Sequence, residues 1–127
     1  MAFQGGDFFD AATLPRGSKT NCYIAKVVLH DWVEEKAVAI VASAMKALDA
    51  AKVPAAERRL FLAEQVLSSD DALAVPKVGL DVNMMVMTGG LERTEAEWAA
   101  VLDKAGWKTL KAHPTRSLFT VLEAVPK

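Results

Sequence analysis

A nearly continuous apolar run at residues 22–29 ends at His30 and constrains the fold more than any other feature of the chain. Such a run, without alternating polar residues, is typical of a parallel strand that is covered on both faces. Asp31 follows at once and can cap a helix, with Glu34 completing a capping-box pattern. Apolar residues then recur at three- and four-residue spacing up to Leu48, which indicates a helix facing a sheet. We therefore predict a strand and a helix with a histidine at their junction.

The middle of the chain predicts a second strand and a short helix. Residues 59–67 are mostly apolar, so the strand–helix–strand order indicates two parallel strands joined by a crossover helix. A polar loop that includes Pro76 follows. Residues 81–88 are expected to form a short buried helix that stops at the glycine pair 89–90. Near the N-terminus, residues 7–10 have the character of the end of an extended segment.

The C-terminal part predicts a capped helix followed by a hairpin. Thr94 and Glu97 match a second capping box, and Gly106 ends that helix. Residues 107–113 and 117–124 are expected to be strands. The link between them is too short for a helical crossover, so this pair is predicted to be antiparallel.

Size and composition describe a single domain without an obvious polymeric partner. The chain has 127 residues, with Lys+Arg 15 against Asp+Glu 16, so charge gives no reason to expect nucleic acid or an anionic membrane as partner. Its apolar runs fall short of the roughly 20 residues that span a bilayer, and the N-terminus does not match a signal peptide. We expect a cytoplasmic protein. Cys22 has no second cysteine to pair with and is expected to be a small buried residue, and the two histidines do not form a metal-ligand cluster with it.

Topology places chemistry-bearing residues at one edge of the predicted sheet. Open α/β sheets bind ligands beyond the carboxyl ends of their strands, and His30 and Glu64 lie at or near such ends. A neutral histidine can accept the proton of an attacking hydroxyl, and adjacent carboxylates can orient it. The residues alone leave alternatives open. His30 could cap or pack, Glu92 could be a solvated residue near a helix N-terminus, and Met84 could be helix-face core rather than pocket lining.

Several short motifs in this chain match one enzyme family in order and spacing. They are residues 6–9 (Gly-Asp-Phe-Phe), 26–32 (Lys-Val-Val-Leu-His-Asp-Trp), 63–64, 81–85, 89–98 and 105–107. Together they resemble the plant-type, caffeate/hydroxyindole-like O-methyltransferases, which use S-adenosylmethionine. The resemblance covers nearly the whole chain. It implies an α/β fold with a partial Rossmann-like methyltransferase sheet: two parallel strands with a crossover helix, then helices and a C-terminal antiparallel hairpin.

The resemblance also implies a role for individual residues. His30 matches the general base, and Glu64 and Glu92 match the residues that flank and orient it. The implied substrate is a small molecule with an aromatic hydroxyl group. Asp7 and Phe8 match positions at the adenine of the cofactor, and Lys26 matches a position near the cofactor's polar end. Asp31 and Met84 match positions on the substrate side.

The chain departs from the family pattern at its beginning. In the family, a glycine-rich turn and an acidic residue for the ribose lie upstream of the Gly-Asp-Phe-Phe motif, but only six residues precede Asp7 and no Gly-x-Gly loop is present. Residues 1–127 are therefore expected to be the C-terminal portion of a catalytic domain, without the N-terminal dimerisation domain and the glycine-rich loop.

Two other interpretations remain beside an enzyme. The strand at residues 22–29 has no earlier strand to pair with, and a long apolar edge favours association with another chain of the same or a different kind. The chain could accordingly be a truncated, non-catalytic paralogue that associates with a full-length methyltransferase. It could also be a generic α/β binding module with accidental motif matches.

Overall fold

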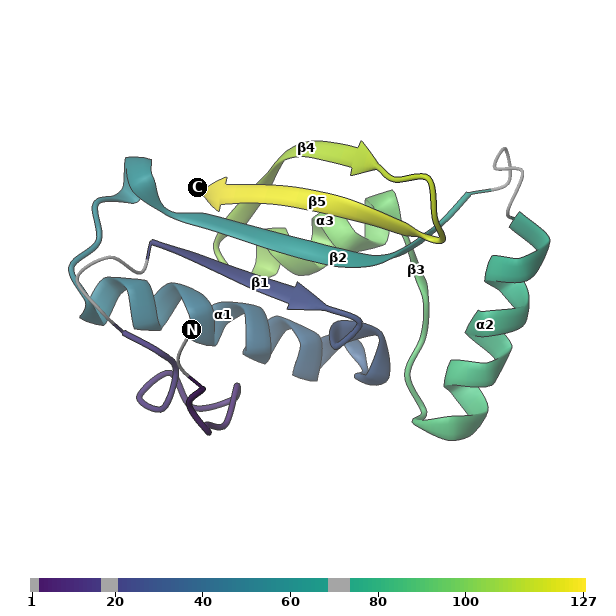
Figure 1. Ribbon diagram of the computed structural model, residues 1–127, viewed down its shortest axis with the longest axis horizontal. Coiled ribbons are helices and arrows are strands. Elements are labelled where there is room, and N and C mark those ends of the chain that lie inside the picture. The colour runs from purple at the N-terminus through teal and green to yellow at the C-terminus, as the bar shows by residue number, and fades with distance from the viewer. Residues whose placement is uncertain (1–2, 17–20, 69–73) are drawn as a thin grey trace.

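The sheet of this protein joins two parallel strands to an antiparallel hairpin (Figure 1). The computed structural model describes residues 3–16, 21–68 and 74–127. Strand β1 (Cys22–Lys26) pairs in parallel with β2 (Arg59–Leu67), which confirms the predicted parallel pair. Strands β4 (Trp107–Pro114) and β5 (Phe119–Pro126) form the predicted antiparallel hairpin. The order is β1-β2-β5-β4, and the two-residue β3 (Arg93–Thr94) pairs with the far end of β2.

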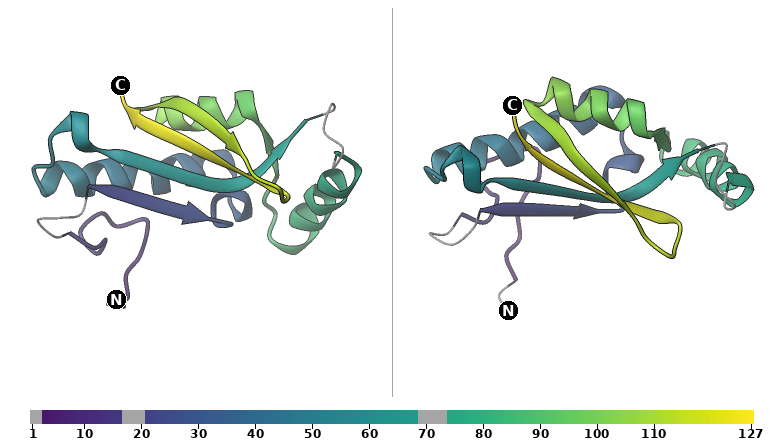
Figure 2. Two further views of the ribbon diagram at one scale, coloured as in Figure 1. Left: turned by 45° about the horizontal axis from the view of Figure 1, so that its top comes forward. Right: turned by 90° about the horizontal axis from the view of Figure 1, so that it is seen from above.

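The helices are unevenly distributed around the sheet (Figures 1 and 2). Helices α1 (Glu34–Ala50) and α3 (Glu95–Lys104) cover one face, whereas α2 (Ala74–Met87) lies beyond the carboxyl ends of β1 and β2. Two short 3-10 helices, η1 (Leu29–Asp31) and η2 (Ala55–Glu57), flank α1 in sequence. The opposite face of the sheet carries no helix in the part of the chain that the structure describes.

The core lies between β1, β2, β4 and β5 on one side and α1 and α3 on the other. Trp98 and Trp107 are fully buried there, and their indole N–H groups donate to the carbonyls of Gln65 and Val41, each at 3.2 Å. Because both N–H groups have acceptors, burial of these rings carries no unsatisfied donor. The predicted apolar stripe of the first helix is buried in this core except for the exposed Val33: Ala37, Ile40, Val41, Ala44 and Leu48.

The first strand is shorter and more open than its composition predicts. It ends at Lys26, because Val27 adopts a φ of 54° and breaks the extended backbone. It lies at the edge of the sheet, and no helix or strand that the structure describes covers its outer face, so Ile24 is 70% exposed. The expectations of a strand over residues 22–29 covered on both faces and of a buried Cys22 are therefore wrong, since Cys22 is exposed.

The first helix begins without the predicted side-chain cap. Asp31 belongs to η1, and the residue that precedes α1 is Val33, which makes no capping hydrogen bond. The prediction that Asp31 caps this helix is wrong, because a 3-10 turn intervenes and leaves the Asp31 carboxylate beside His30. The second capping box is confirmed: Thr94 accepts from the Glu97 amide, and the Glu97 carboxylate accepts from the Thr94 amide.

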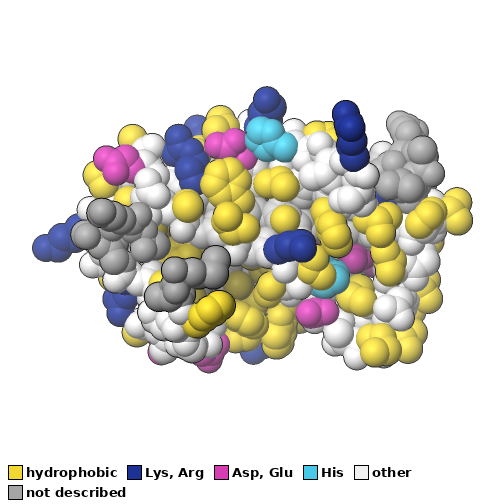
Figure 3. Space-filling view, viewed as in Figure 1, with side chains coloured by type: hydrophobic (Ala, Val, Ile, Leu, Met, Phe, Trp, Pro, Cys, Tyr) yellow, Lys and Arg dark blue, Asp and Glu magenta, His cyan; other side chains and the backbone are white. Residues whose placement is uncertain are grey.

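The middle helix is longer and less buried than predicted. It runs over Ala74–Met87, so Pro76 lies in its first turn, where proline is tolerated, rather than in a loop. Most of its apolar side chains face outward, and Figure 3 shows hydrophobic side chains gathered over this end of the molecule. The expectation of a short buried helix is therefore wrong. Residues 7–10 form turns instead of the end of an extended segment.

Candidate active site

His30 is positioned by a sharp change of backbone direction after β1. Val27 has the rare positive φ, and its amide donates to the Ala63 carbonyl on β2 at 3.1 Å. The chain then enters η1, in which His30 is the middle residue. Because β1 and β2 are parallel, this turn lies at their carboxyl ends, the edge at which open α/β sheets bind ligands.

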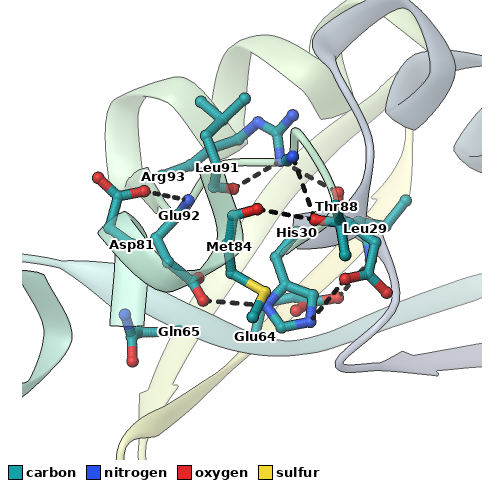
Figure 4. Close-up of polar contacts among 12 residues, drawn as sticks. Leu29, His30, Glu64, Gln65, Asp81, Met84, Thr88, Leu91, Glu92 and Arg93 are labelled. Carbon is teal, nitrogen blue, oxygen red and sulfur yellow. Dashed lines mark hydrogen bonds and ion pairs between the residues drawn. The ribbon is translucent and has the colours of Figure 1, made fainter. Parts of the chain in front are cut away.

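The His30 imidazole contacts two carboxylates (Figure 4). Its Nδ1 lies 2.9 Å from Glu92 Oε1, and its Nε2 lies 3.7 Å from Asp31 Oδ1. A carboxylate can only accept a hydrogen bond, so Nδ1 carries the proton and Nε2 carries the lone pair in the neutral ring. The Glu92 side chain is buried, whereas that of Asp31 is 40% exposed. The nitrogen that can act as a base therefore faces the more open side.

Glu64 holds the backbone of the histidine turn rather than the ring. Its Oε1 accepts from the amides of Val28 and Leu29, at 3.0 and 2.9 Å. The side chain is fully buried, and burial raises the pKa of the Glu64 carboxyl, with the two amide hydrogen bonds and His30 opposing the increase. Among the described residues, no hydrogen bond joins Glu64 to the imidazole, whose partner is Glu92. Its position is therefore suited to fixing where η1 begins.

Two carboxylate oxygens at this edge are buried without a hydrogen-bond partner in the described part of the chain. They are Glu64 Oε2 and Glu92 Oε2. A buried acceptor left without a donor costs about 1–3 kcal/mol. Such costs are uncommon in cores and concentrate where side chains serve chemistry. One further buried oxygen without a partner among the described residues, Thr109 Oγ1, lies on β4, but the two carboxylate oxygens are both at this edge.

The segment that carries Glu92 is fastened directly to the histidine turn. The Leu91 amide donates to the His30 carbonyl at 2.9 Å, and the Glu92 amide donates to Asp81 Oδ1 of α2 at 2.7 Å. At Gly90, an added Cβ would lie 1.9 Å from the His30 carbonyl oxygen, so only glycine allows this approach. Asp81 and Gly90 thus bring Glu92 to the imidazole.

Arg93 is a residue of this site that the sequence reasoning missed. The residue is 1% exposed, and its guanidinium donates to the carbonyls of Leu29 and Trp32 at 3.2 and 2.7 Å and lies 4.9 Å from the centre of the Trp98 ring. One signal was available in the sequence. A cation immediately before Thr94, the N-cap of α3, opposes the helix dipole and therefore needs compensation from elsewhere.

The substrate-side matches lie on two sides of the imidazole. Asp31 is described above, and Met84 of α2 is half-buried, with its side chain directed toward the His30 ring in Figure 4. An open hollow of about 490 Å³ adjoins Asp31. It is lined by Asp31, Trp32, Val33, Lys36, Thr88 and Gly89.

The three cofactor-side matches are less closely grouped. The Phe8 ring, 37% exposed, packs against Phe9 and Trp32 with ring centres 5.0 and 5.9 Å away, and it lines an apolar cavity of about 110 Å³ beside β1. Asp7 is exposed, and its Oδ1 accepts from the Phe9 amide at 2.8 Å. Lys26 is exposed at the end of β1, 5.9 Å from the Phe119 ring. Within the described ranges, neither Asp7 nor Lys26 forms a hydrogen bond or ion pair with His30.

No group of three or more His, Cys, Asp or Glu side chains in the described residues is arranged to hold a metal ion. Likewise, none of the helices that the structure describes combines the length and apolar character needed to cross a bilayer.

A family model for the O-methyltransferase domain matches residues 1–108. The chain is 32% identical over 105 residues to "3'-hydroxy-N-methyl-(S)-coclaurine 4'-O-methyltransferase 2" of Papaver somniferum, covering 81% of this chain and 28% of that protein. It is 34% identical over 118 residues to "8-amino-8-demethylriboflavin N,N-dimethyltransferase" of Streptomyces davaonensis, covering 93% of this chain and 31% of that protein. The chain belongs to the O-methyltransferase domain family.

Solved structures agree with this assignment. TnmH superposes with a TM-score of 0.82 at 29% identity, covering 99% of this chain and 35% of that one. An O-methyltransferase of neocarzinostatin biosynthesis, NcsB1, was solved with S-adenosylmethionine and 2-hydroxy-5-methyl naphthoic acid, and it superposes with a TM-score of 0.76 at 30% identity over 96% of this chain and 32% of that one. The fold is therefore part of the Rossmann-like methyltransferase fold, as predicted. The chain spans about a third of the length of the relatives it matches.

Proposed function

We propose that this chain supplies the catalytic base of an S-adenosylmethionine-dependent O-methyltransferase that acts on an aromatic hydroxyl group, with His30 as that base. The observation that carries the proposal is the 2.9 Å hydrogen bond between His30 Nδ1 and Glu92 Oε1. It leaves Nε2 free to accept a proton. Family membership supports methyl transfer as the reaction class.

The chemistry requires a base, because a phenol has a pKa of about 10 and is mostly protonated at neutral pH. Nε2 of His30 takes the proton from the hydroxyl as the oxygen attacks. The imidazolium formed is stabilised by Glu92 at Nδ1, and Asp31, 3.7 Å from Nε2, adds a second negative charge. Glu64 acts indirectly, since its bonds to two backbone amides hold the turn that carries His30.

S-adenosylmethionine, when bound, supplies the electrophilic methyl group. The residues present suit such a ligand in part. The half-exposed Phe8 ring offers a stacking surface for an adenine, and the exposed Asp7 carboxylate offers an acceptor for an amino group. The exposed Lys26 ammonium can pair with the carboxylate of the amino-acid part. We propose these three residues as the cofactor contacts that this chain provides.

The acceptor is proposed to bind on the α2 side of His30. Met84 is directed toward the imidazole from α2, and thioether side chains pack well against aromatic rings (Figure 4). The hollow beside Asp31 gives space at the same edge. NcsB1, with its naphthoic acid ligand, supports an aromatic acceptor as the substrate class.

A second function is favoured by the open edge of the sheet. Strand β1 has no neighbouring strand on its outer side among the described residues, and the chain spans about a third of the length of its relatives. We propose that residues 1–127 correspond to the C-terminal portion of a catalytic domain. The second candidate function is that of a truncated, non-catalytic paralogue that associates with a full-length methyltransferase.

Calorimetric titration of the folded chain with S-adenosylmethionine separates the two proposals. Micromolar binding, followed by methyl transfer to a phenolic acceptor, would support the enzyme. In that active preparation, His30→Ala should abolish turnover while leaving cofactor binding intact. His113→Ala is the matched control, since His113 also pairs with a glutamate, Glu123, but at the hairpin. Absence of binding by a folded sample, together with co-purification with a full-length relative, would favour the non-catalytic partner.

A further inference from the structure

The buried guanidinium of Arg93 connects the two segments that form the His30–Glu92 pair. Nη1 donates to the Leu29 carbonyl and, at 3.4 Å, to that of Leu91 (Figure 4). Nη2 donates to the Trp32 carbonyl. Leu29 and Trp32 bracket His30, and Leu91 immediately precedes Glu92. The same side chain therefore contacts the backbone on both sides of the base and beside its carboxylate partner.

Arginine is the side chain that this position requires. A planar fork with several N–H donors can satisfy carbonyls that lie in different directions, whereas the single ammonium of lysine is a point charge. Arg93 donates to carbonyl oxygens and lies against the face of Trp98, 4.9 Å away, and it forms no close ion pair with a carboxylate among the described residues. Burial lowers the pKa of the Arg93 guanidinium, and surrounding glutamates oppose that change.

We propose that Arg93 is a positioning residue, which holds η1 and the Glu92 segment in register so that His30 Nδ1 keeps its hydrogen bond and the ring keeps a single tautomer. The proposal rests on the proposed function, because a fixed tautomer is what leaves Nε2 available as the base. It goes beyond that function by assigning the alignment of the pair to a residue that touches neither the imidazole nor the reacting atoms.

The test is nitrogen NMR of the His30 ring in the whole chain, which requires no methyl transfer. Wild type is expected to show the signal pattern of one neutral tautomer with Nδ1 protonated. Arg93→Met and Arg93→Lys should lose that pattern and give averaged nitrogen signals. Arg58→Met is the control, since half-buried Arg58 donates to the Val53 carbonyl and pairs with Asp49 far from the site. It should lower thermal stability and leave the His30 signals unchanged.

The outcomes separate positioning from simple structural support. His30 signals that match wild type in folded Arg93 variants would overturn the proposal, even if those variants unfold at lower temperature. If Arg93→Met does not fold, the Arg93→Lys variant decides alone by the same criterion. Failure of the proposed function would look different: no cofactor binding or turnover, with the His30 signals still responding to Arg93.

Discussion

His30 Nδ1 lies 2.9 Å from Glu92 Oε1, although 62 positions separate these residues in the sequence. The two residues lie on separate segments rather than on one element. A hydrogen bond from the Leu91 amide to the His30 carbonyl joins the backbones of these segments. The two segments approach closely because Gly90 leaves room for the His30 carbonyl.

The Glu92 carboxylate should matter for turnover more than for binding. Glu92→Gln keeps an acceptor for His30 but removes the charge that, in the proposed mechanism, stabilises the imidazolium. In an active preparation we expect kcat to fall on the order of 10²–10⁴-fold, with the Kd for S-adenosylmethionine unchanged. Glu123→Gln is the matched control, since Glu123 pairs with His113 at 3.1 Å away from the site. An unchanged kcat for Glu92→Gln would remove Glu92 from this role.

Burial of Glu64 should make stability depend on pH. The pKa of the carboxyl in the folded chain is raised above the ordinary value of 4.5, so the folded state binds more protons than the unfolded state between the two values. Stability from this group is therefore fully present below the unfolded pKa and is lost as pH rises through the folded pKa.

Glu64→Gln should remove the loss of stability that Glu64 causes as pH rises. The unfolding free energy is to be measured by denaturant titration from about pH 4 to about pH 8 in both chains, and their difference isolates the one carboxyl. As pH rises, the unfolding free energy of the wild-type chain should fall relative to that of the Glu64→Gln variant. A difference that stays constant across the range would show that Glu64 is ionised equally in both states.

Gly90 should not accept even a methyl group. A Cβ there would meet the His30 carbonyl oxygen at 1.9 Å and the Asp31 backbone at 2.7 Å, so the two segments must separate. We expect Gly90→Ala to cost about 1–3 kcal/mol of stability or more. At Gly79 in α2 nothing lies within 4 Å of the added atom, so Gly79→Ala should stabilise by about 0.5–1 kcal/mol. Equal melting temperatures for the two variants would contradict the close approach.

The outer side of β1 should be an association surface. Ile24 is 70% exposed at the edge of the sheet, and unpaired strand edges invite pairing with another chain. Ile24→Lys is expected to reduce self-association in sedimentation experiments without lowering thermal stability. Leu110→Lys is the matched control, since Leu110 is also an exposed apolar residue, 56% exposed, on β4 at the opposite edge of the sheet. A wild-type chain that sediments as a monomer at all concentrations tested would exclude homo-association through this edge.

Sequence patterns succeeded where local chemistry decides the structure. Strand β2 has the predicted bounds, Arg59–Leu67, because an apolar run of that length has few alternatives. The Thr94–Glu97 cap was predictable for the same reason, since its partners lie three positions apart. The hairpin followed from a link too short for a helix.

The predictions that were wrong or missing concern features that depend on residues far away in the sequence. The openness of β1 depends on which strands flank it, and its composition cannot reveal that it forms an edge. Asp31 has the residue type of a cap but is placed by the turn that follows Val27. Arg93 went unnoticed because its acceptors are backbone carbonyls about sixty positions away, and backbone groups have no sequence signature.

The histidine turn is held almost entirely through main-chain atoms: Glu64 binds two amides, Arg93 binds two carbonyls, and the Leu91 amide binds the His30 carbonyl. Any residue other than proline offers the same amide at positions 28, 29 and 91. Leu29 is fully buried in the core, so only positions 28 and 91 are free to change identity while His30 keeps its place. In a saturation library, tolerance at 28 and 91 should be wide with proline as the sharp exception, whereas positions 29, 64 and 93 should be narrow.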